Sequence, residues 1–158
     1  FINYTKDHKI NVRFIEYMPI GQEISDWQQE YVPLTHIFDE CRRAGLKYSP
    51  LTLPGNGPAD NYQIAGYQGS FGLIHPISER FCKSCDRIRI TADGYVKACL
   101  YWNEELNIRP MINDFTAFKH VVQTALDNKP LNHQMAMKNP QQIISPAPTW
   151  RHMSQIGG

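Results

Sequence analysis

Apolar and polar positions along the chain predict a protein that contains both helices and strands. A short strand is expected at residues 12–17, where β-branched and aromatic side chains predominate but do not alternate cleanly with polar ones. Apolar residues on both faces are typical of a parallel strand buried in an α/β sheet. We expect this strand to have no partner within the chain, and its sheet to lie mostly in sequence upstream.

Two stretches have the periodicity of amphipathic helices. In the first, residues 35–44, an apolar stripe contains Ile37, Phe38 and Cys41, and Gly45 follows as a helix-ending residue. The stripe favours Cys41 as a core residue over Cys41 as a metal ligand. The second helix is expected at residues 114–128 and is ended by Lys-Pro. Its apolar positions are Phe115, Phe118, Val121, Val122, Ala125 and Leu126.

Short apolar pieces between Gly, Pro and Asn signals fill residues 45–99 and predict a small, mainly antiparallel sheet. Residues 87–91 and 95–99 form two extended runs, and the Asp93-Gly94 pair between them is a strong hairpin signal. Residues 131–158 have no long periodic segment and are expected to form an extended tail. The predicted fold class is therefore α/β, or α+β for a fragment of a larger fold.

Composition and charge narrow the class of protein. Sixteen Lys and Arg against fifteen Asp and Glu give the 158 residues a net charge of +1, which does not favour nucleic acid or an anionic membrane as a partner. No apolar run approaches the roughly 20 residues of a membrane span, and no signal peptide opens the chain, so we expect a cytoplasmic protein. The first residue is Phe rather than Met, which suggests that the chain begins inside a longer protein.

Three of the four cysteines lie within FCKSCDRIRITADGYVKAC, residues 81–99. The Cys82–Cys85 pair offers two sulfurs from one turn, and the predicted hairpin returns Cys99 toward them. Three thiolates suit either a zinc ion with a fourth ligand from elsewhere or a 4Fe-4S cluster with one open iron. A second Cys pair or a His pair, typical of a zinc ribbon, is absent from the sequence. His75, His120 and His133 are expected to be surface or hydrogen-bonding residues.

Two arginines follow the second cysteine of the pair. Arg87 and Arg89 are two residues apart on a predicted strand, so they share one face of it. Paired guanidinium groups bind phosphate oxygens in bidentate fashion, and they also offset the charge of thiolates or pair with Asp86 and Asp93. An open metal corner beside two arginines favours a ligand with an anionic tail.

Five sequence segments together resemble one known family. They are NVRFIEYMPIGQ (residues 11–22), GNGPADNYQIAG (55–66), GLIHPISERFCKSCDRIRITADGYVKACL (72–100), KPLNH (129–133) and RHMSQIGG (151–158). Their order and the cysteine spacing resemble the C-terminal part of the GTP 3′,8-cyclase (MoaA) family of molybdenum cofactor biosynthesis. The resemblance covers nearly the whole chain.

The resemblance implies a radical-SAM enzyme, a lyase. In that family, a first 4Fe-4S cluster cleaves S-adenosylmethionine, the resulting radical takes hydrogen from C3′ of GTP, and 3′,8-cyclo-7,8-dihydro-GTP is formed. A second 4Fe-4S cluster binds GTP through its guanine. The product passes to cyclic pyranopterin monophosphate synthase, and the full-length protein is expected to be a homodimer. No nucleic-acid or membrane partner is implied.

Particular residues match the family pattern. The resemblance implies that Cys82, Cys85 and Cys99 hold the second cluster. It also implies GTP contacts from Arg87, Ile88, Arg89 and Arg13, a S-adenosylmethionine contact from Met18, and a tail, Gly157-Gly158, that assists the active site without supplying a catalytic residue. Residues 1–20 are then the last segment of an incomplete TIM-type barrel, and residues 21–158 are the second-cluster and GTP-binding domain.

Two departures from the family pattern stand out. Asp86 replaces the usual Asn after the second cysteine, and a carboxylate there is expected to lower the potential of a cluster. The C-x-x-x-C-x-x-C motif of the first cluster is absent from this chain, which is therefore expected to be inactive by itself. The alternative function is a zinc-binding module with a scaffold or nucleic-acid role.

Overall fold

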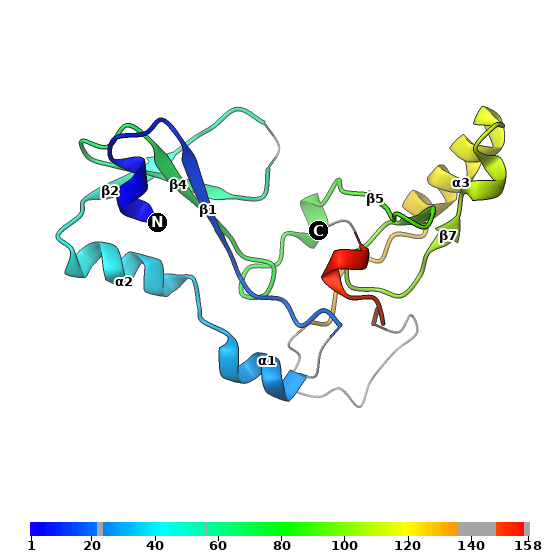
Figure 1. Cartoon of the computed structure of the whole chain (residues 1–158), viewed down its shortest axis with the longest axis horizontal. Coiled ribbons are helices and arrows are strands. Elements are labelled where there is room, and N and C mark those ends of the chain that lie inside the picture. The colour runs from blue at the N-terminus through cyan, green and yellow to red at the C-terminus, as the bar shows by residue number, and fades with distance from the viewer. Residues whose placement is uncertain (22–23, 56, 136–147, 157–158) are drawn as a thin grey trace. The chain divides into compact units, whose positions relative to one another are not determined.

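The computed structural model describes residues 1–21, 24–55, 57–135 and 148–156 of a mixed α/β chain, which agrees with the predicted class (Figure 1). The chain divides into two compact units, each described by itself. Unit 1 comprises Phe1–Met18 and Gln28–Phe81, and unit 2 comprises Pro19–Trp27 and Cys82–Gly158. The predicted boundary at residue 20, drawn between a barrel segment and the following domain, stays a prediction. Within the described residues, every helix is too short or too polar to cross a membrane.

Unit 1 contains a four-stranded sheet in the order β1-β4-β3-β2. The strands are β1 (Asn11–Ile15), β2 (Tyr48–Leu51), β3 (Asp60–Ile64) and β4 (Ser70–Ile74). β1 pairs with β4 in parallel, and the other two pairings are antiparallel. The expectation that the first strand has no partner in this chain was therefore wrong.

The parallel pairing depends on a close approach of the backbone just before β1 and β4. The amide of Ser70 donates to the carbonyl of Ile10 at 2.9 Å. A side chain at Gly69 would place its Cβ 2.4 Å from that carbonyl oxygen and 2.5 Å from the carbonyl oxygen of His8, so only glycine fits there. The sequence signal for this pairing is one glycine, Gly69, which lies far from β1 along the chain. A local sequence pattern therefore does not link the two strands.

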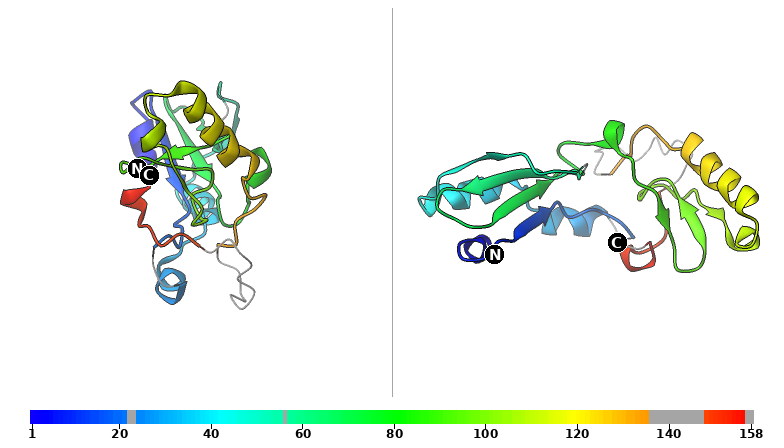
Figure 2. Two further views of the ribbon diagram at one scale, coloured as in Figure 1. Left: turned by 90° about the vertical axis from the view of Figure 1, so that its right-hand side faces the viewer. Right: turned by 90° about the horizontal axis from the view of Figure 1, so that it is seen from above.

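One helix and a group of aromatic side chains form the core of unit 1. Helix α2 (Thr35–Arg43) lies along one face of the sheet, and Gly45 follows it with a positive φ of 66°, as predicted (Figures 1 and 2). Cys41 is 1% exposed and belongs to the core cluster, which confirms its predicted structural role. The cluster's buried members are Leu34, Cys41, Ile64, Phe71 and Leu73. A shorter helix that the sequence did not predict, α1 (Ile24–Glu30), precedes α2.

Unit 2 is built around the predicted hairpin and the second predicted helix. Its sheet has the order β5-β6-β7, and all pairings are antiparallel. The elements are β5 (Arg89–Ile90), β6 (Tyr95–Lys97), β7 (Leu106–Asn107) and α3 (Phe115–Asp127). The third strand, β7, was not predicted. Asp114 caps α3 by accepting a hydrogen bond from the amide of Ala117 at 3.0 Å.

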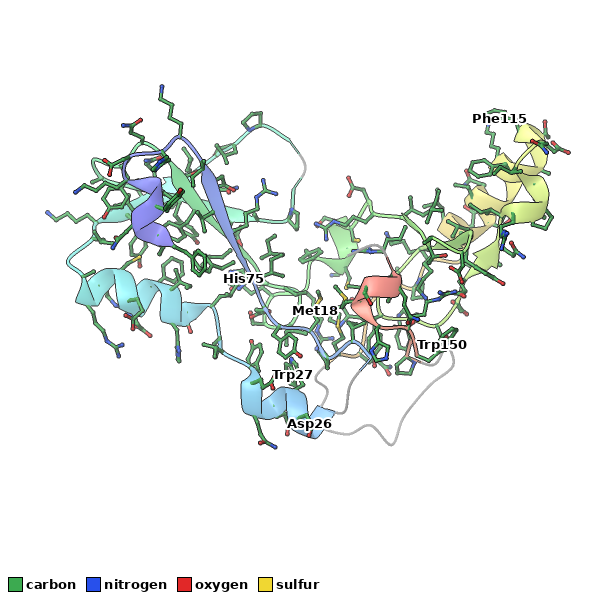
Figure 3. The ribbon with its side chains drawn as sticks, in the orientation of Figure 1. Met18, Asp26, Trp27, His75, Phe115 and Trp150 are labelled. Atoms are coloured by element: carbon green, nitrogen blue, oxygen red, sulfur yellow. The ribbon has the colours of Figure 1, made fainter. Side chains whose placement is uncertain are left out.

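The buried face of α3 is narrower than its sequence pattern suggests. Ala125, Phe118 and Val121 contact a small cluster around Val96 and Ile108. Phe115, by contrast, is 78% exposed and Leu126 is 39% exposed (Figure 3). The short strands of unit 2 offer too little apolar surface to cover the whole stripe.

The described part of the tail, residues 148–156, packs on unit 2. The amide of Thr149 donates to the carbonyl of Tyr101 at 2.6 Å, and Ile156 is fully buried. Arg151 donates two hydrogen bonds to the Glu105 carboxylate, at 2.7 and 2.8 Å, and one to Asp93 at 2.8 Å. The contact with Asp93 attaches the tail to the turn of the β5–β6 hairpin, and the contacts with Glu105 attach it to the residue just before β7.

Candidate metal centre

The first two cysteines of the candidate centre share one tight turn. Residues Cys82–Ser84 form a 3-10 turn, and the amide of Cys85 donates to the carbonyl of Cys82 at 3.2 Å. Both thiols are free and half-buried. The turn gives two neighbouring sulfurs that remain accessible to a metal group.

The third cysteine, Cys99, follows the β5–β6 hairpin. The amide of Thr91 donates to the carbonyl of Tyr95 at 2.8 Å and closes the turn, where Gly94 has a positive φ of 79°. A Cβ at Gly94 would lie 2.2 Å from Cγ of Arg109, so only glycine fits this position. Cys99 follows two residues after β6, is free and half-buried, and lines a cavity of about 490 Å³.

The arginines of this segment are electrostatically linked to the cysteines. Burial lowers the pKa of the Arg89 guanidinium, and the charge of Arg87 lowers it further, while Cys85 and Cys99 act in the opposite direction. Arg89 is therefore within electrostatic range of two of the three thiols and of the second arginine. Ile88, between the two arginines, is 37% exposed.

A lysine that sequence reasoning gave no role lies against the cysteine turn. The ammonium of Lys129 donates to the carbonyls of Cys85 at 2.7 Å and Arg87 at 2.8 Å, and it lies 3.5 Å from the Cys85 sulfur. Lys129 opens the KPLNH segment directly after α3, where a basic residue is also explained by the helix end. Because the helix end already explains a basic residue here, the sequence did not predict that Lys129 contacts a turn more than forty residues earlier.

The described side chains do not form a ready site for a single ion. Among these residues, no group of three or more His, Cys, Asp or Glu side chains is placed to hold one metal ion. Of the histidines considered as extra ligands, His75 and His133 are buried and His120 is exposed. The His133 ring accepts a hydrogen bond from the amide of Met135 at 3.2 Å. Cys41 lies in the core of unit 1, where burial raises the pKa of its thiol.

Arg13 and Met18 belong to unit 1, so they are described apart from the cysteines. Nε of Arg13 donates to Asn11 at 2.8 Å, and the Asn11 amide donates to Asn61 at 3.1 Å and to Ser70 at 2.9 Å. The guanidinium borders a cavity of about 280 Å³ whose lining includes Asn61. Met18 is partly buried (Figure 3).

A glycine in β4 leaves room beside Arg13. Gly72 is paired with Arg13 on one side and with Asn61 on the other. A Cβ at Gly72 would lie 2.8 Å from Oδ1 of Asn61 and 3.2 Å from Cβ of Ala59. The absence of a side chain at Gly72 therefore leaves space for Asn61 beside Arg13. The predicted tail residues Gly157 and Gly158 lie outside the described residues.

Comparison with known proteins identifies the class. Residues 10–135 match the protein family described as Molybdenum Cofactor Synthesis C, and the chain belongs to this family. It is 70% identical over 158 residues to a GTP 3′,8-cyclase of Limosilactobacillus fermentum and 66% identical to one of Lactiplantibacillus plantarum. A GTP 3′,8-cyclase of Listeria monocytogenes is 55% identical over 159 residues.

Each of these matches covers the whole of this chain but only 48% of the relative's length. The chain therefore spans about half the length of the curated relatives it matches. The resemblance to the GTP 3′,8-cyclases of molybdenum cofactor synthesis is confirmed at the level of the family.

Proposed function

We propose that this chain is the part of a GTP 3′,8-cyclase that holds a second 4Fe-4S cluster and binds GTP. The observation that carries the proposal is the run of three free, half-buried cysteines, with Arg87 and Arg89 between the second and the third, in a chain that is 70% identical to a GTP 3′,8-cyclase. Cys82, Cys85 and Cys99 are the proposed ligands.

The donor set, three free thiols in one short segment, suits a cluster with one open iron. A cluster distributes its thiolate ligands over separate iron corners, whereas one zinc ion needs all its ligands to meet at one point. The described side chains of this segment supply three free thiols. With three protein ligands, a bound cluster would supply one open iron as a Lewis acid for the guanine base.

The protein's own residues then bind the rest of the nucleotide. Arg87 and Arg89 donate to phosphate oxygens and offset the negative charge of the thiolates. Ile88 contributes apolar contact, and Arg13, whose Nε donates to Asn11, is proposed as a further GTP contact. Met18 is the proposed S-adenosylmethionine contact, and the role of Gly157-Gly158, which lie outside the described residues, in assisting the active site stays a proposal.

The whole enzyme needs more than this chain supplies. The cysteine motif for the cluster that cleaves S-adenosylmethionine is absent from the sequence, so the chain alone is expected to bind GTP but not to convert it. The complete enzyme is proposed to be a cytoplasmic homodimer, and its product is proposed to pass to cyclic pyranopterin monophosphate synthase.

GTP titration of the reconstituted chain tests the nucleotide site. We expect Arg87→Ala combined with Arg89→Ala to weaken GTP binding by at least about tenfold, because two charge-assisted contacts are removed, while iron content stays unchanged. Arg42→Ala combined with Arg43→Ala, on the exposed surface of α2, is the matched control. Equal GTP affinity in the two double variants would give Arg87 and Arg89 a purely structural role.

A further inference from the structure

Lys129 follows helix α3, but its side chain contacts the cysteine turn and not the helix. Its backbone amide donates to the carbonyl of Leu126 at 3.1 Å, which completes the helix end. Its side chain instead reaches the carbonyls of Cys85 and Arg87 and approaches the Cys85 sulfur. An ammonium has three N–H donors, and these three acceptors account for all of them.

The two carbonyls lie on either side of Asp86. One charged donor that binds both fixes the backbone path from the 3-10 turn to β5. That path sets the direction of the Cys85 sulfur and the positions of Arg87 and Arg89, of which Arg89 begins β5. A substitution of Lys129 should therefore change the positions of Cys85, Arg87 and Arg89 together.

The position of the charge also suits a thiolate ligand. The ammonium lies 3.5 Å from the Cys85 sulfur. Hydrogen bonds and positive charge next to the sulfur ligands of an iron–sulfur cluster raise its potential and stabilise its reduced form. Asp86, which is exposed, supplies the opposite charge one residue further along.

We propose that Lys129 is a positioning residue for the three-cysteine centre, which holds the Cys85–Arg87 backbone and compensates the charge on Cys85. This rests on the proposed function, because it assumes that Cys85 is a cluster ligand. Lys129 does not bind GTP or metal itself. It acts by positioning the turn that carries the proposed cluster ligand Cys85.

Three variants of the 158-residue chain separate this role from a general effect on stability. Lys129→Met removes the charge and every donor, Lys129→Arg keeps both, and Lys119→Met makes the same replacement at an exposed position of α3. The first readout is hydrogen–deuterium exchange of metal-free protein in a peptide covering residues 82–88. We expect faster exchange in Lys129→Met only, with β6 and α3 unchanged.

The second readout is the rate at which anaerobically reconstituted protein loses iron to a chelator. We expect Lys129→Met to lose iron about 10 to 100 times faster than Lys119→Met, as is typical when a residue that orients a metal ligand is removed. Lys129→Arg should restore most of the retention. The reduction potential of the cluster should fall in Lys129→Met and not in Lys119→Met.

The two readouts distinguish an error in the proposed function from an error in the role of Lys129. If wild-type protein takes up no iron or sulfide, the proposed function is wrong, and exchange of residues 82–88 still decides whether Lys129 positions the turn. If wild type holds a cluster but Lys129→Met matches Lys119→Met in exchange and in iron loss, the role of Lys129 is refuted. Should Lys129→Met fail to fold, Lys129→Gln provides the same comparison with one short donor retained.

Discussion

The two units of this chain are stabilised in different ways. Unit 1 has an apolar core, in which Phe38, Tyr48, Tyr62 and Phe71 form an aromatic group with ring centroids 5.0 to 6.5 Å apart. In the described part of unit 2, Val96, Ile108 and Ala125 form a small apolar cluster around the hairpin, and other apolar side chains, such as Trp102 and Ile156, are buried elsewhere. Two charged side chains, Lys97 and Arg151, are buried as well.

The buried charges of unit 2 form one connected group. Lys97 is fully buried, donates to the carbonyl of Trp102 at 2.8 Å and lies 3.6 Å from Glu105, which also pairs with Arg151. Burial lowers the pKa of Lys97, and Glu105 partly offsets this. The comparison teaches that the described part of unit 2, which carries the proposed metal and substrate chemistry, buries paired charges in addition to apolar side chains, whereas the core cluster of unit 1 is apolar and aromatic.

The largest expected effect is in the core of unit 1. Phe71→Ala removes a fully buried ring at the centre of the aromatic group and should lower the free energy of unfolding of unit 1 by about 3 to 5 kcal/mol. Exchange of strands β3 and β4 reports unit 1, and fluorescence reports unit 2, since all three tryptophans, Trp27, Trp102 and Trp150, lie in unit 2. An equal shift in the fluorescence transition would show that the units unfold together and break the comparison.

The next effect is the loss of the ion pair that holds the tail. Arg151→Met should lower the stability of unit 2 by about 3 kcal/mol, because Glu105, only 14% exposed, loses its bidentate partner. Tryptophan fluorescence during urea unfolding measures the change, and Arg43→Met on the surface of α2 is the control. A loss no larger than the control's would mean that buried charge does not stabilise unit 2.

A smaller effect is expected from Glu16, a buried carboxylate of unit 1 that binds the loop after β4. Glu16 accepts hydrogen bonds from the amides of Ile77 and Ser78, at 2.7 and 2.9 Å, and from the hydroxyl groups of Ser78 and Tyr31. Burial alone would raise the pKa of Glu16, but these bonds more than offset burial and hold the pKa below its ordinary value of 4.5.

The sign of the pH dependence follows from this lowered pKa. The stabilisation by Glu16 is fully present above the ordinary value and is lost as the pH falls through the lowered value. Glu16→Gln should cost about 2 kcal/mol at neutral pH and should reduce the acid sensitivity of unit 1. Urea unfolding of both proteins between about pH 7 and about pH 3 measures this, and parallel pH profiles would contradict it.

The sequence predicted the parts whose signals are local. The helix that includes Cys41, the helix that Asp114 caps and the turn at Gly94 each depend on spacing within a short window. The β1–β4 pairing was missed because its partners are far apart and its signal is the absence of a side chain at Gly69 and Gly72. The exposure of Phe115 was missed because periodicity does not show how much surface is available to cover a stripe.

The candidate site divides in the same way. The cysteine spacing and the Arg87–Arg89 pair are visible in the sequence, although their roles as ligands and substrate contacts stay predictions. Lys129 and Arg151 were given no role, because their partners are backbone carbonyls and carboxylates brought close only by the fold. A charged side chain that binds a residue far away in sequence leaves no characteristic spacing, so its partner cannot be predicted from the sequence.

The measurement that tests the central claim most directly is the iron, sulfide and zinc content of anaerobically reconstituted protein. Wild type and Cys41→Ser should each hold about four irons and four sulfides per chain, and Cys82→Ser, Cys85→Ser and Cys99→Ser should each hold almost none. One zinc with no sulfide in wild type, or loss of the cluster in Cys41→Ser, would contradict the three-thiolate iron–sulfur centre.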